Sequence, residues 1–134
     1  MKNKIFVDTL FIVALINKRD QYHPKALKLA QQVENYPLIT TDAVLLEVGN
    51  SLAGNYRNEA INIIEIFLQS DDIEIIHLTP ELFNKAIELY KKYQDKQWGL
   101  VDCVSFVVME ENNINKALTF DKHFIQAGFQ ALMR

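Results

Sequence analysis

Short β-prone apolar runs that alternate with helical segments constrain the fold of this chain more than any other feature. Each run is too short for a helix, and the intervening stretches carry apolar residues at the spacing of amphipathic helices. Strands separated by helices pair in parallel and have both faces covered. The sequence therefore predicts an α/β fold, a three-layer α/β/α sandwich around a mainly parallel sheet. The expected strands span residues 5–7, 38–40, 73–77 and 117–119, with a fifth starting at 128, and the expected helices span 9–16, 23–34, 42–53, 58–68, 80–90, 100–111 and 121–126.

The length of the chain suits one domain. We expect residues 1–134 to form a single domain, because 134 residues can bury one core and no linker, repeat or composition shift divides the pattern. Cys103 is the only cysteine in the sequence, so an internal disulfide is excluded. This cysteine usage suits a reducing, cytoplasmic location.

The beginning of the chain superficially resembles an export signal, because Lys2 and Lys4 precede an apolar run over residues 5–16. Asp8 interrupts this run, and a carboxylate near the middle of an inserting helix costs roughly 2.5 to 3.5 kcal/mol. The run is also too short to span a bilayer, and no small-residue cleavage signal follows it. We therefore expect neither export nor membrane insertion.

Four acidic residues stand where such a fold collects ligands. Asp8 and Asp121 each close a strand, Asp102 opens an apolar helix, and Glu47 lies within the helix that follows the second strand. Ligands of parallel sheets bind at the carboxyl ends of strands, and carboxylates without balancing bases suit hard cations such as Mg²⁺. When these four are set aside from the formal net charge of −3, the remaining residues carry +1, so the overall charge is neutral evidence about a nucleic-acid partner.

Each of the four carboxylates also has an ordinary structural explanation. Asp8 and Asp121 can cap helices by accepting a backbone N–H, and Asp102 can stabilise a first helical turn through the helix dipole. Burial at the end of an apolar helix is costly for an uncompensated carboxylate, which favours a functional role for Asp102. Glu47 lies at the margin of the apolar face of its helix, a position that permits a site without requiring one.

The other polar candidates are weaker. Thr9 and Thr119 can hydrogen-bond a carboxylate or a phosphate, although threonine is also common in strands and helix caps. His23, His77 and His123 have no second histidine or cysteine at metal-binding spacing. We interpret the three histidines as surface or packing residues.

Four acidic motifs follow one another along nearly the whole chain. They are Phe-Val-Asp-Thr at 6–9, Thr-Thr-Asp with Leu-Glu-Val-Gly-Asn over 40–50, Asp-Cys-Val-Ser-Phe at 102–106, and Leu-Thr-Phe-Asp-Lys-His-Phe at 118–124, before Ala-Gly-Phe at 127–129. In order and spacing these motifs resemble the PIN-domain ribonucleases, and among them the VapC-type toxins of bacterial toxin–antitoxin pairs. The chain departs from that pattern at residues 99–101, where many relatives place a serine or threonine before the third acidic position.

The resemblance implies a function with its cofactor and partners. It implies that Asp8, Glu47, Asp102 and Asp121 are catalytic and bind Mg²⁺ or Mn²⁺, and that the chain is an endoribonuclease toxin of a type II toxin–antitoxin pair. Such an enzyme hydrolyses structured RNA with metal-activated water and leaves a 3′-hydroxyl and a 5′-phosphate. The implied partner is a cognate antitoxin that docks between the helices near residues 22–34 and 57–68, and a homodimer is implied as well. The candidate phosphate contacts, unranked, are Lys4, Lys18, Arg19, Arg57, Lys116 and Lys122.

Two alternatives stay open at this point. A phospho-receiver module shares the doubly wound sheet with acidic residues at strand ends, but it expects an acidic pair after the first strand. Here Asp8 is followed by Thr9 and Leu10, and the late lysine such a module needs directly follows Asp121. The second alternative is a PIN fold retained only for binding, which the presence of all four carboxylates disfavours.

Overall fold

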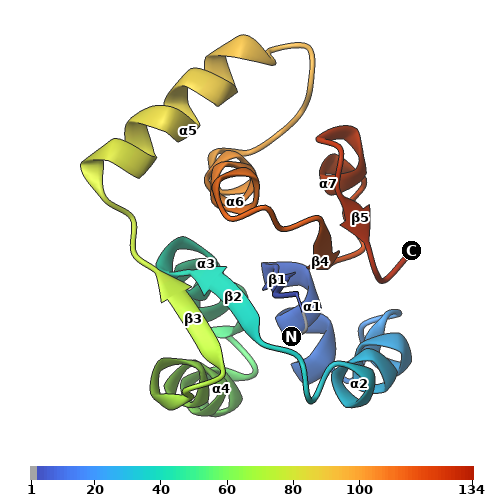
Figure 1. Cartoon of the computed structure of the whole chain (residues 1–134). Helices are drawn as coiled ribbons and strands as arrows, with labels where there is room; N and C mark the ends of the chain where they lie inside the picture. Colours follow the sequence, from blue (N-terminus) through green and yellow to red (C-terminus); the bar gives the residue numbers. More distant parts are fainter. Residues whose placement is uncertain (1–2) are drawn as a thin grey trace.

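A five-stranded sheet with helices on both faces forms the centre of the computed structural model, which describes residues 3–134 (Figure 1). Every strand pair in this range is parallel, and the strand order is β3-β2-β1-β4-β5. The predicted three-layer α/β sandwich with a mainly parallel sheet is therefore confirmed. The strands are β1 (Ile5–Val7), β2 (Leu38–Thr41), β3 (Ile73–Ile76), β4 (Lys116–Leu118) and β5 (Gln130–Ala131).

Seven helices connect these strands within the described residues. Figure 1 shows α1, α2 and α4 on one side of the sheet and α5, α6 and α7 on the other. Local capping explains where two of the helices begin: Thr41 Oγ1 accepts from the N–H of Val44 at the start of α3, and Thr79 Oγ1 accepts from Leu82 at the start of α5. The helices are α1 (Thr9–Ile16), α2 (His23–Gln32), α3 (Asp42–Leu52), α4 (Arg57–Gln69), α5 (Pro80–Lys92), α6 (Leu100–Glu111) and α7 (Lys122–Gln126).

The hydrophobic core surrounds β1 and one face of α6. The three side chains of β1 are at most 4% exposed, which explains why its sequence is apolar throughout rather than alternating. Phe106 of α6 makes edge-to-face ring contacts with both Trp98 and Phe124 at centroid distances of 5.0 Å. The contact with Phe124 packs α6 against α7. No helix of the described range is long and apolar enough to cross a membrane.

The order in which strands are added to the sheet reverses at β1. From β1 the chain builds β2 and then β3 on one side, and it later returns to add β4 and β5 on the other side. Val7 is paired with Leu118, so the residues that follow β1 and β4 lie next to each other. A reversal of strand order of this kind leaves a ligand-binding crevice at the carboxyl ends of the strands.

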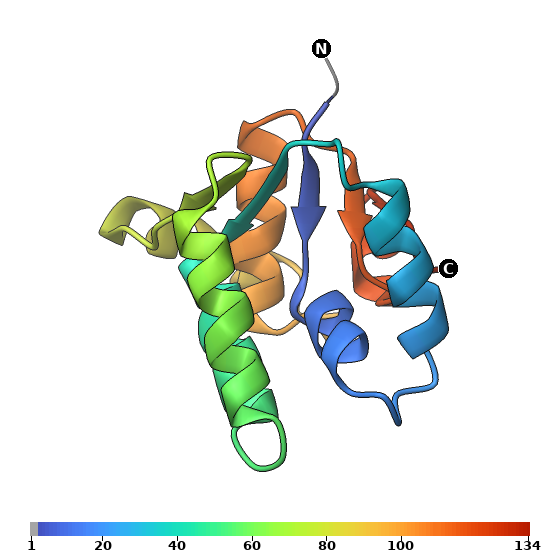
Figure 2. The same ribbon diagram turned by 90° about the horizontal axis from the view of Figure 1, so that it is seen from below.

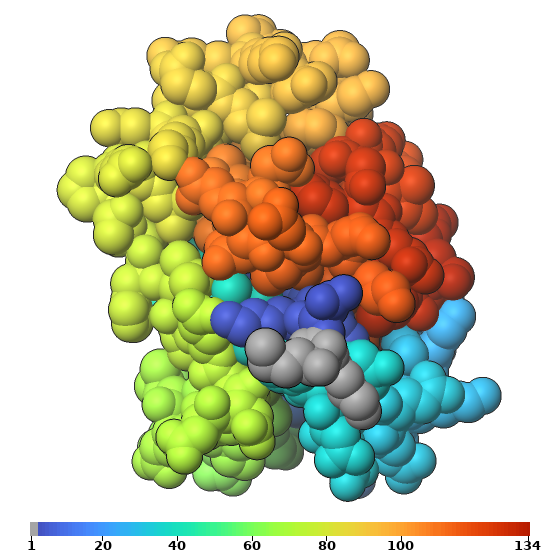
Figure 3. Space-filling view, in the orientation of Figure 1, coloured from blue at the N-terminus to red at the C-terminus, as the bar shows by residue number. Residues whose placement is uncertain are grey.

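The two ends of the sheet can be told apart by the direction of the strands. Figure 3 shows the end at which the strands begin, with the start of β1 in blue between the orange segment that leads into β4 and the green and cyan segments around β2 and β3. Figure 2 shows the strand arrows pointing away from this end, toward the loops that join α1 to α2 and α3 to α4. The carboxyl ends of the strands therefore face those two loops.

Candidate functional site

Asp8 ends the central strand, and its side chain points toward the residue that follows β4. Its Oδ2 accepts a hydrogen bond of 2.8 Å from Thr119 Oγ1, and its backbone N–H donates to the carbonyl of Leu118 at 3.3 Å. Asp8 occupies the N-cap position of α1, but its side chain makes no capping hydrogen bond. The capping explanation therefore does not account for this carboxylate, which is only 4% exposed.

Asp121 is held beside Asp8 by the same threonine. The N–H of Asp121 donates to Thr119 Oγ1 at 3.1 Å, so one hydroxyl group contacts both acidic residues. The Oδ1 atom of Asp121 also accepts from the N–H of His123 at 2.9 Å and caps α7. Capping thus explains part of the position of Asp121, while Thr119 ties the residue to the crevice.

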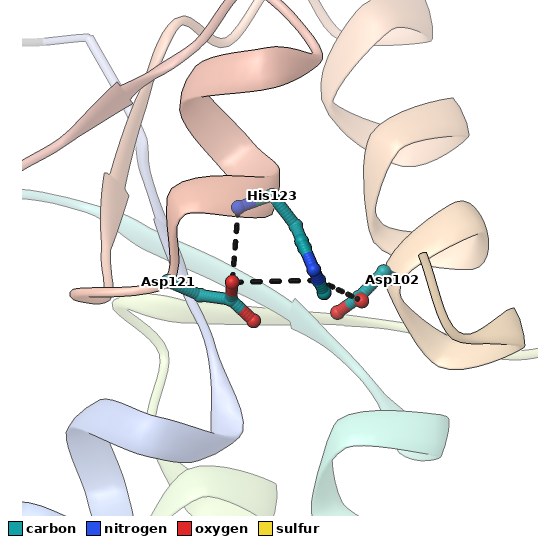
Figure 4. Close-up of side chains that lie close together, drawn as sticks. All are labelled: Asp102, Asp121 and His123. Carbon is teal, nitrogen blue, oxygen red and sulfur yellow. Dashed lines mark hydrogen bonds and ion pairs between the residues drawn. The ribbon is translucent and has the colours of Figure 1, made fainter. Parts of the chain in front are cut away.

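Asp102 approaches from α6 and meets Asp121 through a histidine (Figure 4). Asp102 Oδ2 accepts from the N–H of Gly99 at 3.1 Å and lies 3.1 Å from His123 Nδ1, and the same nitrogen is 3.4 Å from Asp121 Oδ1. One potential ligand atom from each of these three residues lies within 4.8 Å of the other two. The three side chains, all half-buried, could share one metal ion.

The interpretation of His123 as a surface or packing residue is therefore wrong. Asp121 caps α7 by accepting from the N–H of His123, and this brings the His123 imidazole close to the carboxylates of Asp121 and Asp102. The spacing Asp-x-His at a helix start was the available signal. The interpretation suits His23, whose Nδ1 is 2.8 Å from the carbonyl of Ala14, and the exposed His77.

Glu47 reaches the site from α3 on the other side of β1. Its Oε1 accepts a 2.7 Å hydrogen bond from Thr9 Oγ1, the residue directly after Asp8. The side chain is half-buried, and no hydrogen bond within residues 3–134 joins it to the other three carboxylates. Both threonines, Thr9 and Thr119, thus hydrogen-bond a carboxylate as expected.

The electrostatics of this cluster, defined as Asp8, Glu47, Asp102 and Asp121, show a shortage of positive charge. Burial raises the pKa of Asp8 to about 7; the hydrogen bond from Thr119 opposes the rise, and the charges of Asp102 and Asp121 add to it. Burial also raises the pKa of Asp102, against hydrogen bonds from Gly99 and His123. Among the described residues, no lysine or arginine forms an ion pair with the cluster.

An oxygen-rich, negatively charged crevice fits a hard divalent cation. Mg²⁺ and Mn²⁺ take carboxylate ligands, and the charge of a bound cation would oppose the effects of burial and of the neighbouring carboxylates that raise the pKa of Asp8. Cys103, next to Asp102, offers no thiolate for softer metals or for nucleophilic attack, because burial raises the pKa of its thiol to about 11. The chemistry of this site is therefore that of carboxylates and one histidine.

Comparisons with known proteins identify the family to which the chain belongs. The family model for the PIN domain matches residues 5–130. The chain is 32% identical over 126 residues to VapC20 of Mycobacterium tuberculosis, a 23S rRNA-specific endonuclease, covering 93% of this chain and 95% of that protein. The crystal structure of VapC20, described as a sarcin–ricin loop cleaving toxin, superposes with a TM-score of 0.84 over the same shares of the two chains. VapBC2 of Rickettsia felis, bound to a promoter DNA fragment, shares the fold at 18% identity, with a TM-score of 0.66 and 96% of both chains covered.

These findings define the class of the protein. The chain belongs to the PIN-domain family of ribonucleases, and within that family to the VapC-type toxins of toxin–antitoxin pairs. It is accordingly an endoribonuclease, and the phospho-receiver and purely binding alternatives are set aside.

Proposed function

We propose that the cluster of Asp8, Glu47, Asp102 and Asp121 is the catalytic centre and that it binds Mg²⁺, with Mn²⁺ as a substitute. The observation that carries this proposal is the buried carboxylate of Asp8, whose pKa is raised to about 7 in the company of two further acidic side chains. An uncompensated buried carboxylate is costly, and residues 3–134 provide no lysine or arginine partner for it. A divalent cation supplies the missing charge.

The chain's own residues prepare this centre before a metal binds. The Thr119 hydroxyl orients Asp8, and the Thr9 hydroxyl orients Glu47, so the carboxylates on both sides of β1 are fixed by hydrogen bonds. His123 holds Asp102 and Asp121 together. A divalent ion held by these carboxylates would lower the pKa of a water for attack on the phosphodiester and would stabilise negative charge that develops in the reaction.

The substrate that we propose is a loop of a structured ribosomal RNA. The support is the similarity over nearly the whole chain to VapC20, whose name and structure describe cleavage of 23S rRNA at the sarcin–ricin loop. Bases in such loops are unstacked and accessible, unlike those of an A-form helix. Hydrolysis would leave a 3′-hydroxyl and a 5′-phosphate.

The decisive experiment is cleavage of a 23S rRNA fragment containing that loop, by the purified chain with Mg²⁺, Mn²⁺ or EDTA. We expect cleavage with either ion, none with EDTA, and a loss of at least about a hundredfold for Asp8→Asn and Asp102→Asn, because even outer-shell changes cost 10- to 100-fold. Asp71→Asn, which alters an exposed aspartate of the α4–β3 turn, is the matched control and should retain activity. If both cluster variants fold and cleave as well as the unmodified chain, the cluster is not the catalytic centre.

The proposed partner is an antitoxin that covers an apolar groove. A pocket of about 240 Å³ lies between α1, α2 and α4, lined by Phe11, Leu15, Val33 and Phe67 among others. Of these three helices, α2 and α4 correspond to the two segments that the family resemblance indicated, and an apolar helix or strand of an antitoxin would fit in the groove. Co-expression with the neighbouring open reading frame should yield a stable complex, and its absence would contradict this assignment.

The proposal extends to the domain organisation, the oligomeric state and the cellular location of the protein. We propose that residues 1–134 act as one domain, that the protein forms a homodimer, and that it works in the cytoplasm without a membrane. The match of the family model to residues 5–130 supports the single domain, and an RNA substrate supports a cytoplasmic location. Size-exclusion chromatography with light scattering measures the oligomeric state directly.

A further inference from the structure

The direction of the strands divides the candidate phosphate contacts into two groups. Lys4 precedes β1 and Lys116 begins β4, so both lie at the amino end of the sheet, away from the cluster. Lys4 also forms an ion pair with Glu74. Lys18 and Arg19 lie in the loop after α1, and Arg57 begins α4 after the loop from α3; these two loops are at the carboxyl end (Figure 2).

One asparagine joins the two loops that carry these cations. Asn17 Oδ1 accepts from the backbone N–H of Arg19 at 3.0 Å and from the hydroxyl of Tyr56 at 3.1 Å. Tyr56 directly precedes Arg57, whose Nε donates to the carbonyl of Ala53 at 3.3 Å. The backbone positions of the two arginines are therefore held relative to each other through a single amide oxygen.

The basic rim, defined as Lys18, Arg19 and Arg57, is not neutralised by the protein. All three side chains are exposed, and none of them takes part in an ion pair within residues 3–134. The nearest acidic residues in sequence are Asp20 and Glu59, and Asp20 Oδ1 is already an acceptor for the N–H of Tyr22. The rim is thus available to an external anion.

We propose that the basic rim binds the sugar–phosphate backbone of the RNA substrate and positions it over the cluster; this rests on the proposed function. α1 is 8 residues long, about 12 Å, so its far end lies within a few nucleotides of Asp8. A cluster of carboxylates repels RNA, and cations at the same end of the sheet offset that repulsion. Lys122 also lies at this end, but it directly follows Asp121, so its substitution would disturb the cluster itself.

The test compares two double variants of equal charge change. Arg19→Gln/Arg57→Gln removes two rim charges, and Lys4→Gln/Lys116→Gln removes two charges from the amino end. We expect the rim variant to raise KM with kcat unchanged and to lower the slope of log KM against log salt by about 1.4, at about 0.7 per phosphate contact. Between 50 and 200 mM salt, KM of the unmodified chain should then rise about sevenfold more than that of the rim variant. The amino-end variant should keep both the KM and the slope.

Further arms separate charge from folding and from the proposed function. Arg19→Lys/Arg57→Lys keeps the charges and should restore most of the affinity, whereas a purely structural role would leave it defective. If the unmodified chain cleaves RNA and the rim variant has the same KM and salt slope, the rim proposal is wrong while the proposed function stands. If no RNA is cleaved, the proposed function fails. RNA binding by the rim is then measured separately, by fluorescence anisotropy of a labelled RNA. If the rim variant and the unmodified chain show the same salt dependence of RNA affinity in that measurement, the rim proposal is wrong. Loss of antitoxin binding with unchanged RNA kinetics also overturns it and assigns the rim to a protein partner.

Discussion

The two ends of the sheet differ in whether their charged side chains form ion pairs with each other. At the amino end, Lys4 forms an ion pair with Glu74 at the surface. At the carboxyl end, the carboxylates of the cluster are partly or fully buried and the cations of the basic rim lie exposed on or next to the two loops, with no ion pair between the two groups among the described residues. Opposite charges that could neutralise each other are held apart, so the compensation must come from ligands. The proposed metal ion at the cluster and the proposed RNA backbone on the rim would each supply the missing opposite charge.

We predict that ionisation of the buried Asp8 carboxyl destabilises the metal-free protein as the pH rises. The folded-state pKa of Asp8 is about 7, whereas an unfolded aspartate titrates near pH 4. The folded state therefore holds a proton that the unfolded state has lost, and this stabilising contribution, present below about pH 4, disappears as the pH rises through about 7. Because each pKa unit corresponds to about 1.4 kcal/mol, the full loss is about 4 kcal/mol.

Urea unfolding in EDTA between pH 4 and pH 8 measures this effect. The unfolding free energy of Asp8→Asn minus that of the unmodified chain should grow with pH up to about 7 and then level off, since asparagine does not ionise. The subtraction removes the contributions of groups that the two proteins share, provided that they titrate alike. If this difference in unfolding free energy stays constant across the range, folding does not raise the pKa of Asp8.

The local parts of this architecture were predictable from the sequence. The nearly continuous apolar character of β1 and α6 reflects the burial of all of β1 and of most of α6, so the existence of both elements was predictable from their composition. Asp8 was identifiable as a candidate because it closes an apolar strand at the end where parallel sheets bind ligands, although helix capping explained it equally well until the structure was known. The final strand, by contrast, contains only two residues and starts at Gln130 rather than Gly128, since so short a pairing has no pattern of its own.

The contacts between distant segments were not predictable. The hydrogen bond from Thr119 to Asp8 joins residues 111 positions apart, and the sequence shows only that both could take part in such a bond. The approach of His123 to Asp102 depends on the packing of α7 against α6 through Phe106 and Phe124. The separation of the lysines and arginines into two ends depends on strand direction, which charge counts do not contain.

We also predict that a divalent ion stabilises the folded protein by offsetting the negative charge of the cluster. At pH 8, a divalent ion at a hundred times its dissociation constant should stabilise the unmodified chain by about 3 kcal/mol, because it binds the folded state alone. The stabilisation should disappear in Asp102→Asn and persist in the amino-end variant Lys4→Gln/Lys116→Gln. Thermal unfolding over a Mg²⁺ titration, with MnCl₂ as a second series, measures the shift. Equal shifts in all three proteins would mean that the ion binds elsewhere.

The smallest predicted effect distinguishes the two threonines within the carboxyl end. Thr9→Val removes the hydrogen bond to Glu47, a half-buried carboxylate that water can still reach, so stability should fall by only about 1 kcal/mol. Thr119→Val leaves the carboxylate of Asp8 buried without that donor and the N–H of Asp121 without its acceptor, and its cost should approach 3 kcal/mol, the upper part of the range for a buried polar group without a partner. Urea unfolding in EDTA at pH 8 compares the two variants directly. Because valine matches threonine in shape, equal losses would mean that Asp8 and Glu47 are equally accessible to water, and the contrast between a buried and an open carboxylate on the two sides of β1 would have to be abandoned.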